Sequence, residues 1–441
     1  MFRKIINTLG TKVLGALLSF IVAAVISHAV GDVGKGEQTL LLSTIAFVLI
    51  FSDIVSGASL VYLTPKHPFS KLFLPSYVWS TLVGLMAAAA IPLFYPSLPH
   101  VIALHIGLLS ILSSLSAVNT TILVGRERVV AANMVNLWQP AALLATVCIC
   151  YFGLDMLNIN AYIIALYVAY GGSWLAGLML LHNEFRGFKI HSWHEYQPVL
   201  KDLFHFGLLN QSSHFVQFFN LRLSYYLLDT YIDRGSTGVF SNAVSLVEAV
   251  WIISRSIALV QYARIANADD RAYSQRLTLD LSKICLSVSL AAMALLACFP
   301  PFFYRWLFGP EFGEITYLIW ILAPGALLYS TALIFGHYYS GIGKYLINTY
   351  TAMCGVVFTF ACGFTLIPQF GIYGAAITSS CANAANAVFI ALLFIHHSHL
   401  KIKNLFITPK DIHQYAQSIQ TYCQNIAKNI SSITRKEQDH E

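Results

Sequence analysis

The stretch from Leu203 to Ala266 carries the side chains whose types and spacing could do chemistry in this chain. Arg222, Glu248 and Arg255 stand within two apolar runs that are long enough to cross a membrane. A charged side chain near the middle of a bilayer costs about 3 kcal/mol on insertion scales, so it normally faces protein or water rather than lipid. These residues therefore predict a polar, hydrated surface inside a bundle of helices.

Amides and an imidazole accompany the two arginines on the same runs. Asn210 and His214 share the first run with Arg222, and Asn242 shares the second with Arg255. Arginine keeps its charge at any pH, and its planar guanidinium group can donate two parallel hydrogen bonds to phosphate oxygens. We interpret these five residues as the lining of a substrate-binding cavity that suits an anionic cargo.

Two carboxylates within predicted spans, Asp53 and Glu248, are the candidates for ion coupling. A carboxylate at this depth can take up and release a proton during a transport cycle. The alternative is that they pair permanently with Arg222 and Arg255 and only fix helix packing. Glu248 and Arg255 are seven positions apart, about 10 Å along a helix, so they are too distant to pair directly. No cofactor or metal is expected, and coupling to H⁺ or Na⁺ stays open.

The composition is that of an integral membrane protein. Of the 441 residues, 57% are hydrophobic and 10% are charged, whereas about 25% charged residues is usual for a soluble domain. The net charge of +6 does not indicate a nucleic-acid partner, because most of the basic residues lie in the short segments between the apolar runs and do not form one cluster. The eight cysteines form no C-x-x-C pair and are interpreted as small buried side chains.

Apolar runs long enough to cross the hydrocarbon core, which needs about 20 residues, recur along the chain. They predict an all-α, polytopic membrane protein. The first run has no cleavage site after it and is expected to be retained as a span. The twelve runs cover about 11–30, 39–63, 72–95, 100–124, 129–153, 160–181, 203–228, 238–261, 281–301, 315–339, 345–367 and 372–396.

Lysines and arginines give the orientation, since cytoplasmic loops carry an excess of them. With the amino terminus in the cytoplasm, 21 of the 26 lie on the cytoplasmic side, 3 on the other side and 2 within spans. Both termini are therefore predicted to be cytoplasmic. The outward turns are short, and no nucleophile–histidine–acid set stands on one loop, so an enzyme is not expected.

Length divides the twelve runs into two halves. Matching Gly36 with Gly238 relates the halves by an offset of 202 positions, which places Asp53 opposite Arg255. After Thr408, isoleucines and tyrosines recur at helical spacing and predict an amphipathic helix on the inner membrane surface. The predicted division is an amino-terminal lobe 1–182, a cytoplasmic linker 183–202, a carboxyl-terminal lobe 203–397 and a cytoplasmic tail 398–441.

Three segments of the second half resemble Wzx-type oligosaccharide flippases of the multidrug/oligosaccharidyl-lipid/polysaccharide (MOP) exporter superfamily. They are NLRLSYYLLDTYIDRGSTGVFSNAVSLVEAVWIISRSIALVQYARIA, FYRWLFGPEFGEITYLIWILAPGALLYSTALIFGHYYSGIGKY and IPQFGIYGAAITSS. Their order and spacing agree with that family over about 203–396. The first half is similar more loosely, through the glycine turn from Gly31 to Gly36.

The resemblance implies two six-helix lobes around a central cavity, as in MATE transporters, that alternate access to the two membrane faces. It implies an undecaprenyl-pyrophosphate-linked oligosaccharide as cargo, moved from the cytoplasmic to the periplasmic leaflet of a bacterial inner membrane. A polysaccharide polymerase or export machinery would be the protein partner. The alternative is a multidrug or organic-cation antiporter of the same superfamily, whose cavity should be net negative. Because two arginines balance two carboxylates within the predicted spans, the cavity is not expected to be net negative, which favours an anionic or neutral cargo.

Overall fold

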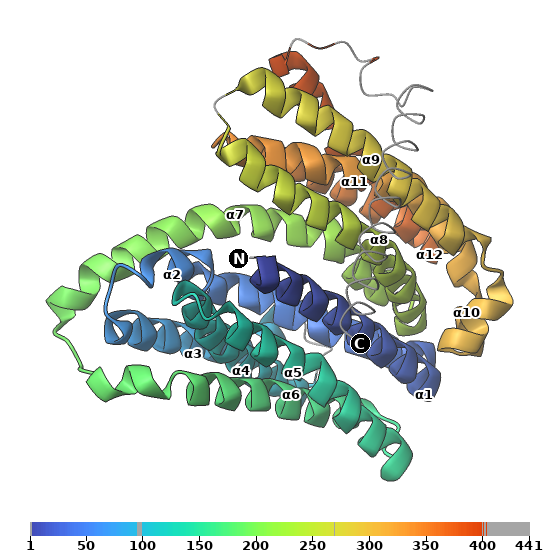
Figure 1. The fold of residues 1–441 in the computed structure, drawn as a ribbon. Coiled ribbons are helices and arrows are strands. Elements are labelled where there is room, and N and C mark those ends of the chain that lie inside the picture. Colours follow the sequence, from blue (N-terminus) through green and yellow to red (C-terminus); the bar gives the residue numbers. More distant parts are fainter. Residues whose placement is uncertain (1, 95–98, 269, 399, 401–402, 404–441) are drawn as a thin grey trace, which may run out of the picture.

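The computed structural model describes residues 2–94, 99–268, 270–398, 400 and 403, and this part of the chain is almost entirely helical (Figure 1). The predicted amphipathic helix of the tail lies outside the described residues. Short 3-10 or π segments connect some of the α-helices. The helices are α1 (Phe2–Ser56), α2 (Ala58–Leu63), α3 (Phe69–Phe94), α4 (His100–Gly125), α5 (Val129–Cys148), α6 (Ile159–Leu180), α7 (Trp193–Tyr231), α8 (Arg234–Ala266), α9 (Arg271–Cys298), α10 (Pro301–Phe308), α11 (Ile315–Gly341) and α12 (Leu346–Ser398).

Twelve membrane crossings follow from these helices. Within the described ranges, nine helices are long and apolar enough to span a bilayer. Two of them, α1 with 55 residues and α12 with 53, are long enough to cross twice, and each leaves helical geometry at one glycine, Gly31 or Gly371. Helix α7 has 39 residues but is more polar than the nine, and it supplies the remaining crossing. The structure confirms the predicted all-α, polytopic fold class.

The first two crossings are joined more tightly than the sequence predicted. The expected turn AVGDVGKGEQ is helical except at Gly31, whose φ of 69° favours glycine. Lys35 therefore lies inside the lobe and not in an outward loop, with only 5% of its surface exposed. Its Nζ donates to Gln38 Oε1 at 2.7 Å, and Gln38 Nε2 donates to the hydroxyl of Tyr162 on α6 at 3.2 Å.

The helices pack as two lobes that meet at one end and diverge at the other (Figure 1). Helices α1–α6 form the amino-terminal lobe around apolar clusters that include Ile106 and Leu166. Helices α8–α12, with the second half of α7, surround a separate core that includes Phe240 and Phe394. We call the end that contains Gly31 the closed end, and the opposite end, where α2 finishes, the open end.

Helix α7 passes from one lobe to the other. It begins at Trp193, inside the predicted linker 183–202, and its first turns pack through Val199 on the amino-terminal lobe. At Gly207 the helix backbone lies against the carbonyl of Ile54, where a Cβ would overlap that oxygen. Leu228, near its other end, belongs to the carboxyl-terminal core. Since α7 is a continuous helix, it connects the two lobes mechanically.

Polar contacts fasten the start of α7 to the amino-terminal lobe. Lys71 Nζ lies 2.7 Å from Glu195 Oε2, and this hydrogen bond lowers the pKa of Glu195 to about 2. The ring of His191 contacts Ser70 Oγ at 2.9 Å and Glu195 at 3.2 Å. The start of α7 is thus held by polar and charged side chains at the start of α3.

Glu195→Gln is expected to speed limited proteolysis of the linker several-fold, because Lys71 loses its charged partner. The folded-state pKa of Glu195 lies below its ordinary value of 4.5, so its contribution is complete above that value and is lost as the pH falls toward 2. The ratio of mutant to wild-type cleavage rates should therefore stay constant from pH 8 to pH 5.5. Asp202→Asn, an exposed carboxylate on the same helix, is the control. A ratio that falls to one within this range would contradict the assignment.

Candidate functional site

A reciprocal glycine contact joins the lobes at the closed end. A Cβ at Gly36 of α1 would overlap the carbonyl oxygen of Arg234, and a Cβ at Gly238 of α8 would overlap the carbonyl oxygen of Asp32. Each glycine meets the residue that stands four positions before the other glycine. The contact therefore has approximate two-fold symmetry, with equivalent residues 202 positions apart.

Side-chain hydrogen bonds continue this contact. Thr39 Oγ1 and Ser241 Oγ, themselves 202 positions apart, lie 2.8 Å from each other. Asn242 Nδ2 donates to Ser27 Oγ at 2.7 Å. Asn242 is 1% exposed, so the structure places it in the contact between the lobes and not on an open cavity surface. That placement differs from its predicted role as a cavity residue.

Burial along α8 shows where the lobes part. Every residue from Thr237 to Val244 is buried, so the helix is enclosed on all sides near the closed end. From Ile252 onward, each turn of α8 has exposed residues, and Arg255 is one of them. The second half of α8 is therefore less enclosed by protein than the stretch from Thr237 to Val244.

Arg222 and Glu248 form the central ion pair of the carboxyl-terminal lobe. The two guanidinium nitrogens of Arg222 donate to the two carboxylate oxygens of Glu248 at 2.8 and 3.1 Å, and Nη1 also donates to the hydroxyl of Tyr225 at 3.1 Å. The side chains of Arg222 and Glu248 are 28% and 20% exposed. Such a forked geometry is the strong form of this interaction. In this structure Arg222 is paired, and its partner is Glu248 rather than Asp53.

Arg255 is placed differently. It stands fourteen positions after Ser241 and seven after Glu248, on the α8 stripe that faces the amino-terminal lobe at Ser241. Within the described ranges, no carboxylate oxygen lies within 4.0 Å of its guanidinium group. Arg255 is therefore an exposed cation that faces the diverging part of the two lobes.

Two residues of neighbouring helices complete this polar face. Gln217 Nε2 on α7 donates to the hydroxyl of Tyr329 on α11 at 2.8 Å. Tyr329 lies within electrostatic range of both Arg255 and Glu248. The sequence did not indicate that Tyr329 belongs to this site, because Tyr329 stands in an apolar run far from α8 in the chain. Only the packing of α11 on α8 brings it close to Arg255 and Glu248.

The remaining predicted residues lie nearer the open end. Asp53 is half-buried on α1, where it accepts from Ser56 Oγ at 3.2 Å, and no lysine or arginine of the described residues lies within 4.0 Å of it. Its backbone oxygen receives Gln211 Nε2 of α7 at 3.5 Å. His214 is exposed and Asn210 is half-buried on the same helix. The structure thus brings Arg222 and Glu248 into contact, and among the described residues it gives Asp53 and Arg255 no ionic partner.

Metal ligation is not indicated by the arrangement of side chains. In the part of the chain that the structure describes, no three histidine, cysteine, aspartate or glutamate residues gather as they would around a metal ion.

Solved structures of MATE family transporters and of a lipid II flippase have this fold. The lipid II flippase MurJ in an inward closed conformation matches with a TM-score of 0.72 at 13% identity, over 92% of this chain and 89% of that one. An inward-facing MATE family transporter of the MOP superfamily matches with a TM-score of 0.69 at 14% identity, over 87% of this chain and 94% of that one. An outward-facing MATE transporter matches with a TM-score of 0.60 at 15% identity, over 89% and 93%.

No protein-family model and no curated protein sequence matches the chain. The structural matches, at these low identities, show the fold. The protein thus has the same fold as these MATE transporters and as MurJ, with two helical lobes.

Proposed function

We propose that the protein is a flippase that moves an undecaprenyl-pyrophosphate-linked oligosaccharide from the cytoplasmic to the periplasmic leaflet by alternating access. The observation that carries this proposal is Arg255, an exposed cation without an ionic partner among the described residues, on the α8 face between the diverging lobes. Moving phosphates across about 30 Å of hydrocarbon requires a cationic, hydrated path. Arg255 offers the first cationic contact, because Arg222 is already bound to Glu248.

The proposed cycle starts from the state seen here, with the open end in the cytoplasm. In this orientation the positively charged loops are inside, as the lysine and arginine distribution predicts. The anionic headgroup enters between the lobes, where Arg255, His214 and Asn210 are accessible. Parting of the closed end then releases it on the periplasmic side. The higher TM-score to the inward-facing than to the outward-facing MATE structure supports this starting state.

Asp53 is the proposed coupling site for H⁺ or Na⁺, since Glu248 is engaged by Arg222. The protein would work in the bacterial inner membrane with both termini in the cytoplasm, supplying a polysaccharide polymerase or export machinery. It would catalyse no covalent reaction.

Arg255→Ala is expected to lower the flipping rate of the lipid-linked oligosaccharide in proteoliposomes by about 10-fold or more. Hydrogen bonds to a charged group contribute about 1.5–3 kcal/mol, which corresponds to roughly 10- to 100-fold. Arg255→Lys should keep part of the rate because it retains the charge. Arg264→Ala, an exposed arginine in the last turn of the same helix, is the matched control. Wild-type flipping in Arg255→Ala would remove the observation on which the proposal depends.

An organic-cation antiporter is the second candidate, and Asp53 favours it, because a half-buried carboxylate that has no cationic partner among the described residues could bind a cation. The same proteoliposomes distinguish the two. Uptake of a cationic dye that is abolished by Asp53→Asn, together with unaffected dye uptake in Arg255→Ala, would support the antiporter and overturn the flippase.

A further inference from the structure

An apolar cavity of about 770 Å³ lies between the two lobes. Most of its lining comes from α1 and α3 of the amino-terminal lobe and from the second half of α7, and Ile102 and Ile106 of α4 and Ile159 of α6 complete it. Its volume is within the range of about 300–1,000 Å³ that is usual for small-molecule sites. The surface is almost entirely aliphatic and aromatic, contributed by residues such as Phe47, Val83, Met86, Ala87, Phe218 and Phe219.

The cavity is bounded by polar contacts at its two ends. Toward the open end, Trp79 Nε1 donates to the Phe51 carbonyl at 2.9 Å, and its ring packs on Phe204 of α7 with centroids 4.8 Å apart. At the closed end, Arg234 contacts Glu37 and Asp229, each at 3.1 Å. Between these two ends the lining is almost entirely apolar, so it suits an apolar ligand rather than a charged one.

The shape of the cavity fits a chain that runs across the membrane. From Glu37 to Phe51, α1 contributes lining residues over fourteen positions, which is about 21 Å of helix. The hydrocarbon core of a bilayer is about 30 Å thick. The cavity therefore covers much of the depth that a lipid chain occupies, parallel to the helices that enclose it.

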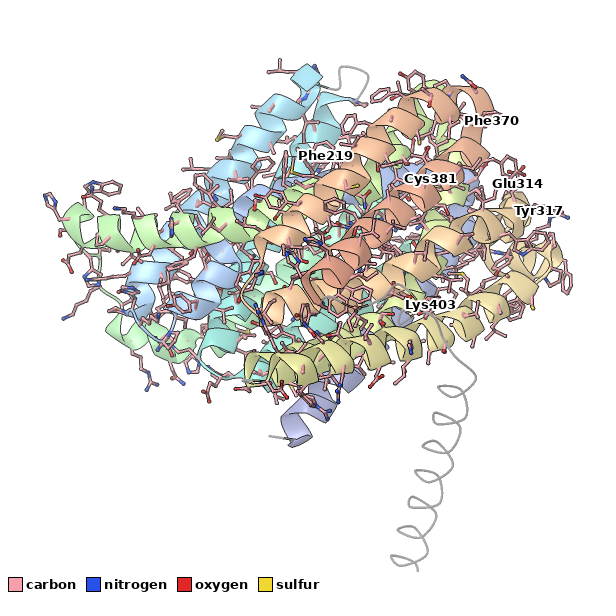
Figure 2. The ribbon with its side chains drawn as sticks, turned by 90° about the horizontal axis from the view of Figure 1, so that it is seen from above. Phe219, Glu314, Tyr317, Phe370, Cys381 and Lys403 are labelled. Atoms are coloured by element: carbon pink, nitrogen blue, oxygen red, sulfur yellow. The ribbon has the colours of Figure 1, made fainter. Side chains whose placement is uncertain are left out.

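The walls belong to both lobes. Phe219 of α7, labelled in Figure 2, has its ring 6.0 Å from that of Phe47 on α1 and 6.2 Å from that of Phe360 on α12. Met86 of α3, which also lines the cavity, is 68% exposed, so this part of the wall is not covered by other described side chains. A chain bound here would enter laterally, and a change in the angle between the lobes would alter its contacts.

We propose that this cavity binds the isoprenoid chain of the carrier lipid while the headgroup occupies the space between the lobes. The inference rests on the proposed flippase function and names the site of the apolar half of its cargo. An ordinary bilayer lipid could bind to the surface of one lobe alone. The chain of a transported lipid must stay in contact with the protein while the lobes change their angle, so a site lined by both lobes suits it better.

The test uses the full-length protein in liposomes and an undecaprenyl diphosphate that carries a diazirine in its chain and no sugar. Photolysis is expected to label peptides of α3 and α7. Ala87→Trp and Ala90→Phe, which fill the cavity, should each reduce this labelling at least five-fold. Leu82→Trp is the matched control, because Leu82 is an exposed residue of α3 that does not line the cavity. Size-exclusion profiles and binding of the same probe at peptides outside the cavity show whether the variants are folded.

Three results would overturn the inference: no labelling of α3 and α7, equal loss of labelling in Leu82→Trp, or labelling by a diazirine phosphatidylglycerol that excess undecaprenyl diphosphate does not displace. Failure of the proposed function would look different. In that case the chain probe would label the cavity and be lost in Ala87→Trp, while wild-type protein would not flip the complete lipid-linked oligosaccharide.

Discussion

Gly238→Leu is expected to abolish transport and to leave the membrane-inserted protein with its closed end parted. The side chain would overlap the carbonyl oxygen of Asp32, a backbone atom in a helix that packs on both sides. Backbone does not yield as the far end of a flexible side chain does, so the two lobes would have to separate. We expect the flipping rate to fall at least about 100-fold, because the state that binds cargo from the open end is no longer reached.

The measurement is the rate at which a membrane-impermeant maleimide, applied from the periplasmic side, labels Thr39→Cys. The labelling of the protein without this substitution, which contains only the native cysteines, is subtracted as background. Thr39 is buried in the glycine contact, so labelling should be slow in the parent background and rapid with Gly238→Leu. Gly36→Leu should behave in the same way because the contact is reciprocal. Gly171→Leu is the control, since a Cβ at Gly171 meets nothing within 4 Å. Unchanged labelling with full transport in Gly238→Leu would contradict the role of this contact.

Glu248→Ala is expected to destabilise the protein by about 2 kcal/mol, because it leaves the Arg222 guanidinium with Tyr225 as its remaining partner in a mostly buried position. Arg222→Ala should do the same. The double variant should be more stable than the sum of the single effects predicts, with a coupling of about 1–3 kcal/mol. The measurement is thermal unfolding in detergent, followed by the monodisperse fraction on size exclusion.

Transport assays on the same variants separate packing from cargo binding. If the pair only positions α7 against α8, Arg222→Ala and Glu248→Ala should lose flipping together and in proportion to their stability. Arg222→Ala that keeps wild-type stability but loses flipping would show instead that Arg222 contacts the headgroup, as the sequence also allowed. The control is Ser256→Ala, a half-buried position on α8 next to Arg255.

Several features of the site were accessible from sequence and others were not. The intramembrane charges identified α7 and α8 as the polar helices, because a charge in an apolar run must face protein or water. The partner of each charge could not be predicted, since Arg222 and Glu248 are 26 positions apart and meet only where α7 packs on α8. Asn242 looked like a cavity residue by the same reasoning, but it is buried against Ser27. Polar residues in a span indicate the side of the helix that faces away from lipid. They do not show whether that side packs against another helix or lines a cavity.

The sequence by itself determined the number of crossings and the offset of 202 positions between the halves, and it predicts an orientation from the lysines and arginines. These properties depend on local hydrophobicity, on charge in the loops and on chain length. Only the tertiary structure decided which glycines meet, which arginine keeps a free charge and where an apolar chain could enter. Those outcomes depend on the angle between two lobes, and that angle is set by contacts between residues far apart in the chain.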